Sequence, residues 1–61
     1  SKIYNAKFNF EPIIGETYYL YLDKNGNDFL SLISPTQCSF NYSATCTLGP
    51  DKMWIKREVS E

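Results

Sequence analysis

Hydrophobic and polar residues alternate with a period of two along much of the chain, which is typical of β-strands that bury one face. In residues 3–10, aromatic residues and alanine take the even positions, asparagine and lysine take odd positions, and Pro12 ends the run. Residues 17–22 predict a strand, because they are six consecutive residues of high strand preference. Residues 29–33 predict a returning strand that a Ser-Pro pair ends.

The second half of the chain carries the same pattern with more polar residues. Residues 38–42 are interpreted as an irregular segment or an edge strand, and residues 43–48 place alanine, cysteine and leucine at alternate positions. The Gly-Pro-Asp-Lys segment at 49–52 predicts a turn, and residues 53–59 predict a last strand. No ten-residue segment shows the i, i+3, i+4 spacing of an amphipathic helix, so no helix is expected.

These elements predict an all-β fold, a small antiparallel meander of four or five strands. The sheet is expected to close into an SH3-like half barrel or to curl over one covered face. We expect residues 1–61 to form a single small β domain. Because the chain begins with Ser1 and not with methionine, we expect a fragment or a processed part of a longer chain.

The Asp-Lys-Asn-Gly-Asn segment at residues 23–27 predicts a hairpin turn. A two-residue Asn25-Gly26 turn would place Asp23 opposite Asp28, and this pair of like charges destabilises the hairpin. A three-residue loop with Gly26 at a bulge avoids the pair. The bulged loop predicts four cross-strand pairs: Leu22 with Asp28, Tyr21 with Phe29, Leu20 with Leu30 and Tyr18 with Leu32.

This register sorts the hairpin side chains onto two faces. One face carries Tyr18, Leu20, Leu22, Leu30 and Leu32, and the other carries Thr17, Tyr19, Tyr21, Phe29, Ser31 and Ile33. Both faces are apolar, so the hairpin has to be covered twice. A rolled-up sheet can cover one side, and another element, another chain or a ligand has to cover the second.

Composition narrows the class of protein. With 43 % hydrophobic and 16 % aromatic residues, the chain is too apolar for a disordered tail. A formal charge of −1 argues against strong nucleic-acid binding, because that function needs an excess of cations on one face. The longest apolar run, residues 18–22, is far shorter than the roughly 20 residues of a membrane-spanning helix. We therefore expect a soluble protein without a membrane partner, and the low cysteine count, two in all, predicts a cytoplasmic one.

The sequence carries no residue set typical of catalysis, metal binding or a cofactor. It has no histidine, no glycine-rich phosphate loop and no nucleophile motif, so we do not expect an enzyme. Two cysteines without histidine cannot supply the four ligands of a zinc site. Cys38 and Cys46 are expected to be reduced thiols, although their spacing leaves a disulfide open. Asn41-Tyr42-Ser43 is a glycosylation sequon only in a secreted protein.

Aromatic residues are the candidate binding residues. Tyr19, Tyr21 and Phe29 share the second face of the hairpin, and Tyr42 and Trp54 are expected to join them. Plain core packing is the alternative to a binding role. A tyrosine hydroxyl needs a polar partner or water, which fits a half-exposed surface better than a dry core.

Two functions are compatible with these residues. We expect a non-enzymatic protein-interaction or self-assembly module, whose partner is another protein or a second copy of the chain. The alternative is weak single-stranded nucleic-acid binding, in which the same rings stack on bases beside a basic cluster. That cluster comprises Lys52, Lys56 and Arg57, which otherwise form a solvated strand edge.

Several short motifs occur in a fixed order. They are Gly-Glu-Thr-Tyr-Tyr-Leu-Tyr at residues 15–21, Asn-Gly at 25–26, Phe-Leu-Ser-Leu-Ile-Ser-Pro at 29–35, and then Leu48, Asp51 and Trp54. In this order they resemble the C-terminal part of an uncharacterised family, a domain of unknown function with members in bacteria and animals. The resemblance covers residues 3–58. It implies a further segment upstream in the parent chain, and it implies no known activity.

Overall fold

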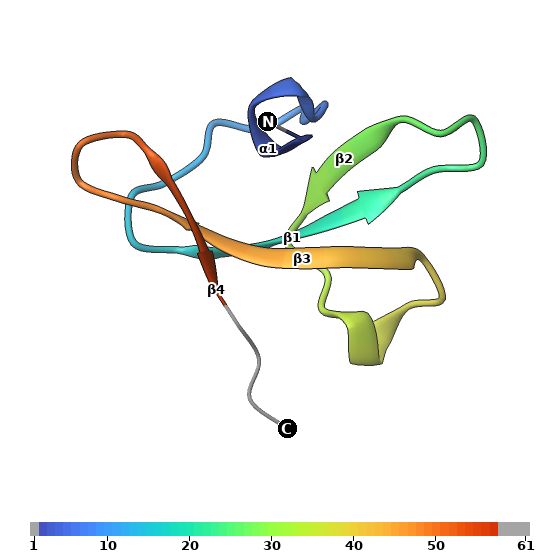
Figure 1. Ribbon diagram of the computed structural model, residues 1–61. Helices are drawn as coiled ribbons and strands as arrows, with labels where there is room; N and C mark the ends of the chain where they lie inside the picture. The colour runs from blue at the N-terminus through green and yellow to red at the C-terminus, as the bar shows by residue number, and fades with distance from the viewer. Residues whose placement is uncertain (1, 58–61) are drawn as a thin grey trace.

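Four antiparallel strands form one sheet in the computed structural model, which describes residues 2–57 (Figure 1). The elements in chain order are α1 (Lys2–Asn5), β1 (Thr17–Leu22), β2 (Asp28–Ser31), the short 3-10 turn η1 (Pro35–Gln37), β3 (Asn41–Leu48) and β4 (Trp54–Arg57). The predicted all-β class and the antiparallel pairing are confirmed. Within residues 2–57, no helix is long and apolar enough to cross a membrane.

The strands are ordered β2-β1-β3-β4, so the predicted meander order is wrong. In a meander β3 would pair with β2, whereas here β3 pairs with β1 and residues 32–40 carry the chain past β1. The physical reason is that β1 is apolar on both faces. In the central position of the sheet, both edges of this apolar strand are paired. An SH3-like half barrel stays a prediction.

The hairpin of β1 and β2 has the predicted bulged register. Leu20 pairs with Leu30, Tyr21 with Phe29 and Leu22 with Asp28. Gly26 has a φ of 83°, a conformation that glycine adopts without steric cost. The Asp23 carboxylate accepts hydrogen bonds of 2.9 Å from the amides of Asn25 and Asn27, which stabilises the turn.

The far end of this hairpin differs from the prediction. The ladder ends where Tyr19 pairs with Ser31, so Tyr18 and Leu32 are not a cross-strand pair. Leu32, which was expected on the buried face, is 60 % exposed. The chain leaves the sheet here because Ser34 caps η1, which begins at Pro35, and proline cannot continue a ladder.

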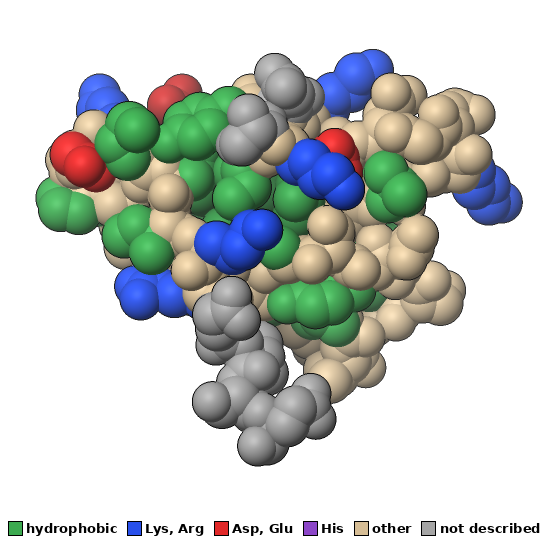
Figure 2. All heavy atoms as spheres, in the orientation of Figure 1, with side chains coloured by type: hydrophobic (Ala, Val, Ile, Leu, Met, Phe, Trp, Pro, Cys, Tyr) green, Lys and Arg blue, Asp and Glu red, His purple; other side chains and the backbone are tan. Residues whose placement is uncertain are grey.

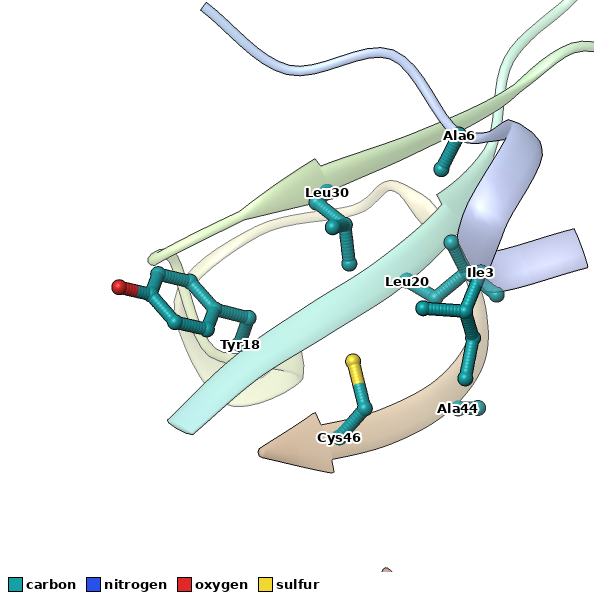
Figure 3. Packing of buried hydrophobic residues seen from close by; sticks show 7 residues of the cluster. All are labelled: Ile3, Ala6, Tyr18, Leu20, Leu30, Ala44 and Cys46. Atoms are coloured by element: carbon teal, nitrogen blue, oxygen red, sulfur yellow. The ribbon is translucent and has the colours of Figure 1, made fainter. Parts of the chain in front are cut away.

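The core lies on one face of the sheet. Tyr18 and Leu20 from β1, Leu30 from β2, and Ala44 and Cys46 from β3 form one buried cluster with Ile3 and Ala6 of the N-terminal segment (Figure 3). Phe10 and Trp54 pack against this cluster. The Phe10 ring stacks on Tyr18 at 5.3 Å between centroids, and Trp54 meets the same ring edge-on at 5.9 Å. We call this side of the sheet the core face.

The strand predicted over residues 3–10 is wrong. Residues 2–5 form one helical turn, and only Lys7 bridges to the sheet, parallel to Phe29. Ile3 and Ala6 are three residues apart, so one turn of helix brings both onto the same side, where both are buried. A short apolar run is compatible both with the alternation of a strand and with the spacing of a helix. Packing against the core decides which of the two structures forms.

The C-terminal hairpin joins β3 and β4 through the predicted turn at residues 49–52. The amide of Gly49 donates to the carbonyl of Met53 at 2.8 Å, and the amide of Lys52 donates to Gly49 at 2.9 Å. The predicted last strand, residues 53–59, is observed as Trp54–Arg57, and residues 58–59 lie outside the described residues. The predicted irregular segment before β3 extends to residue 40.

Candidate functional site

The second face of the sheet is organised by a bulge in β3. Leu20 pairs with Ala44, but the next residue, Tyr21, pairs with Tyr42, so Ser43 has no partner across the ladder. A bulge of this kind re-aims the side chains of the strand that carries it. It places Tyr42 on the same face as Tyr21, opposite the core face.

Four aromatic side chains meet on this second face, and we call them the aromatic cluster: Tyr21, Phe29, Phe40 and Tyr42. Tyr21 is central, with centroid distances of 5.5 Å to Phe29, 5.4 Å to Phe40 and 6.2 Å to Tyr42. Phe29 and Phe40 meet edge-on at 5.4 Å. These separations and tilted geometries are those that aromatic pairs prefer. The rings therefore form one packed group.

Exposure distinguishes the aromatic cluster from the core. Tyr21 is fully buried, yet Phe40 is 47 % exposed and Tyr42 is 40 % exposed. A hollow of about 500 Å³ lies beside the rings. Its lining comprises Leu22, Asp23, Lys24, Phe29, Ser39, Phe40 and Asn41. The site thus combines apolar walls with a polar rim, which is the usual composition of a recognition surface.

The hydroxyl of Tyr21 ties the linker between β2 and β3 to the sheet. It donates a hydrogen bond to the carbonyl of Ile33, and the thiol of Cys38 lies 3.5 Å from its oxygen. Burial raises the pKa of Tyr21, and the Cys38 contact raises this pKa further. The phenol stays neutral, so it remains a donor and holds in place the linker that carries Phe40.

The structure brings together three of the five predicted binding residues: Tyr21, Phe29 and Tyr42. Tyr19 lies on the same face, half-buried between Ser31 and Thr45, but outside the aromatic cluster. Trp54 does not join them on this face, because it pairs with Leu48 and packs on Tyr18 on the core face.

Phe40 is the residue that sequence reasoning missed. It precedes β3 directly and closes one wall of the hollow. A signal was available in its spacing, because Phe40 and Tyr42 are two residues apart and would share a face of an extended segment. Because residues 38–42 were interpreted as either irregular or an edge strand, this spacing was not used.

The three basic residues of the proposed nucleic-acid surface do not share a face. Lys56 pairs with Cys46 and so lies on the core face, whereas Arg57 pairs with Thr45 on the aromatic side. Lys52 lies in the turn before β4, with a φ of 65°. On the side of the molecule seen in Figure 2, Lys and Arg side chains are scattered around the hydrophobic ones.

The two cysteines lie on opposite faces and are free thiols. Cys46 is fully buried in the core, where burial raises the pKa of its thiol. Cys38 lies half-buried on the aromatic side, within 3.5 Å of the Ser34 carbonyl. No group of three metal-ligating side chains occurs in the part of the chain that the structure describes.

Comparison with known families gives one match. The model of the family described as Protein of unknown function (DUF2452) matches residues 1–60. Comparison with curated proteins and with solved structures finds no match. The match spans the residues over which the sequence resembles a domain of unknown function, so that resemblance is confirmed at the level of an uncharacterised family.

Proposed function

The chain belongs to this DUF2452 family, and from its geometry we propose that the aromatic face makes it a non-enzymatic protein-interaction or self-assembly module. One observation carries the proposal. Phe40 and Tyr42 remain 47 % and 40 % exposed although both pack on the fully buried ring of Tyr21. Large rings held rigidly at a surface are typical anchors of protein interfaces.

The aromatic cluster is preorganised for binding. Its rings contact one another, and the Tyr21 hydroxyl fixes the linker that supplies Phe40. A partner therefore loses little side-chain entropy on contact, which is the main cost that preorganisation removes. The hollow beside Phe29 and Phe40 has room for an apolar side chain from the partner.

The exposed apolar surface extends beyond the aromatic cluster. Ile33 is 43 % exposed where its carbonyl accepts the Tyr21 hydroxyl, and Ile55 pairs with Thr47 on the same side of the sheet and is 41 % exposed. A stable interface buries about 800 Å² on each partner, more than four rings provide. These two isoleucines would enlarge the contact at either end.

We place a second copy of the chain first among partners, and another protein second. Nucleic-acid binding remains the alternative function, and of the three predicted basic residues only Arg57 pairs on the aromatic side. We also propose that the protein is cytoplasmic and that its sheet has an SH3-like curvature.

The test is the solution mass of the full chain, measured by light scattering on a size-exclusion column at two concentrations and two salt levels. We expect the fraction of dimer to increase with concentration and to be insensitive to salt, because salt screens charges and has little effect on an apolar contact. Phe40→Ala should return the chain to a monomer. Ile13→Ala is the matched control, since Ile13 is 61 % exposed but lies outside the aromatic cluster.

Three results would contradict the proposal or redirect it. A wild-type monomer at every concentration excludes self-assembly. Equal loss of the dimer in Ile13→Ala would show that the effect of Phe40→Ala is not specific to the aromatic cluster. Binding of a labelled oligothymidine that weakens steeply with salt, measured by fluorescence anisotropy, would favour the nucleic-acid alternative.

A further inference from the structure

One short segment contacts both outer edges of the sheet. Residues 2–7, which we call the strap, contain α1 and lie between the two hairpins in Figure 1. Ile3 and Ala6 are each only 7 % exposed and anchor the strap to the core (Figure 3). Tyr4 and Lys7 then reach opposite edges. On the β2 side, the backbone of Lys7 bonds to Asp28 and Leu30, the two neighbours of Phe29.

At the outer edge of β2, the backbone of Lys7 bonds to two of the groups that point away from β1. The hydrogen bond from the Asp23 amide to the Asn27 carbonyl sets the phase of the hairpin ladder. In that phase Asp28 and Leu30 direct their backbone groups outward. Lys7 donates to the Asp28 carbonyl at 3.0 Å and accepts from the Leu30 amide at 2.9 Å.

At the outer edge of β4, the side chain of Tyr4 has the equivalent role. The Gly49 to Met53 hydrogen bond sets the ladder phase, so Trp54 directs its amide away from β3. The Tyr4 hydroxyl accepts this amide at 3.0 Å, and its oxygen lies 3.6 Å from the Met53 sulfur. One six-residue segment therefore bonds to the backbone at both ends of the four-stranded order.

We infer that the strap opens and closes as one unit, and that it thereby couples the two outer edges of the sheet. One helical turn joins Ile3 to Ala6, and the Ala6 amide donates to the Ile3 carbonyl at 3.2 Å. Tyr4 lies within this turn and Lys7 follows it directly, so neither contact can be released far without straining the other. An unpaired strand edge accepts a further strand. Strap opening would expose two such edges together.

The test is amide hydrogen exchange in the full chain, followed by NMR at the Leu30 and Trp54 amides. Tyr4→Phe removes the acceptor for Trp54 and leaves Lys7 intact. If the strap is one unit, this change lowers the protection of Leu30, at the opposite edge, by about two- to tenfold, the equivalent of one net hydrogen bond. Asp23, in the same hairpin as Leu30, should keep its protection.

A matched variant controls for the loss of a phenol hydroxyl. Tyr42→Phe also removes a half-exposed hydroxyl that has a hydrogen bond, but Tyr42 does not contact the strap, so Leu30 should be unaffected. The inference is overturned if Tyr4→Phe accelerates only Trp54, because the two edges are then independent. It is also overturned if Asp23 loses as much protection as Leu30, since global unfolding then explains both.

The coupling is reciprocal, which provides a second measurement. Lys7→Pro removes the donor to the Asp28 carbonyl and should accelerate exchange at Trp54, whereas Lys7→Ala keeps the backbone donor and should not. An unchanged Trp54 amide in a folded Lys7→Pro chain overturns the inference. If Lys7→Pro does not fold, the Tyr4→Phe measurement decides the question.

Discussion

The two faces of the sheet use the same strands but are covered in different ways. On each face one tyrosine of β1 is fully buried, Tyr18 on the core face and Tyr21 on the aromatic face. Each hydroxyl bonds to the backbone of a linking segment. Tyr18 accepts from the Ile13 amide at 2.8 Å, and Tyr21 donates to the Ile33 carbonyl. The two centres are built alike.

The difference lies in what surrounds each tyrosine. Phe10 and Trp54 are half-buried against Tyr18, and the strap closes the rest of the core face. Around Tyr21, Phe40 and Tyr42 remain close to half exposed. The chain therefore covers the surroundings of Tyr18 more completely than those of Tyr21. This contrast supports an interaction role more directly than the number of aromatic residues does.

The largest expected effect is that of truncating a core residue. Leu20→Ala should lower the free energy of unfolding by about 2–5 kcal/mol, because it leaves a cavity beneath the strap. A domain of this size has only about 3–9 kcal/mol in total. Phe40→Ala, on the aromatic face, should cost about 1–2 kcal/mol. Urea denaturation followed by circular dichroism measures both, and equal losses would mean that the two faces are equally complete.

The cysteines give a matched pair with one residue on each face. Cys46→Ser should lower the free energy of unfolding by about 1–3 kcal/mol, because it buries a hydroxyl in an apolar core. Cys38→Ser should change it by less than about 0.5 kcal/mol, since the hydroxyl can bond to Tyr21 and Ser34. Thermal denaturation compares the two variants. Similar losses in both would show that the aromatic side is as dry as the core.

Alkaline pH should destabilise the fold through the aromatic face. The pKa of Tyr21 is raised by burial, so its phenol stays protonated in the folded chain while the unfolded chain loses that proton above about pH 10. Stability is therefore retained below this pH and falls above it, by up to about 1.4 kcal/mol per pH unit from this group. Tyr21→Phe should reduce that slope in urea denaturation series between pH 8 and pH 11. An unchanged slope would show that Tyr21 ionises normally.

The smallest expected effect is at the exposed rim of the aromatic cluster. Tyr42→Phe removes a hydroxyl that bonds only to the Thr45 side chain at the surface, so the free energy of unfolding should change by less than about 0.5 kcal/mol. The same urea titration detects it. A loss above about 2 kcal/mol would place Tyr42 in the core and remove a main difference between the faces.

Local features of the fold were predictable from the sequence. Residues 17–22 are strand formers throughout, and the like charges of Asp23 and Asp28 excluded the shorter hairpin loop, so the register of β1 and β2 followed. The need for two covers on the hairpin also followed from its two apolar faces. The pairing of Tyr21 and Phe29 within the candidate site rests on this register alone.

Non-local features were not predictable in the same way. Nothing in β3 alone decides whether it pairs with β1 or with β2, and this choice overturned the meander. The face of Trp54 depends on the register of β4 against β3, not on alternation within β4. The strand predicted over residues 3–10 was wrong for a related reason. Ile3 and Ala6 favour a helical turn only when both can pack on a sheet beneath them.

The strand order has a consequence for how quickly the molecule folds. Each hairpin joins neighbours in the chain, and such pairs form in about 1–10 μs. The seam between β1 and β3 joins residues far apart, from Leu22 with Asn41 to Thr17 with Thr47. The pairing of β1 with β3 requires closure of the long loop through β2 and η1. The chain loses the conformational entropy of this loop before the hydrogen bonds of the ladder compensate for the loss. We therefore expect the two hairpins to form first, and the pairing of β1 with β3 to set the folding rate.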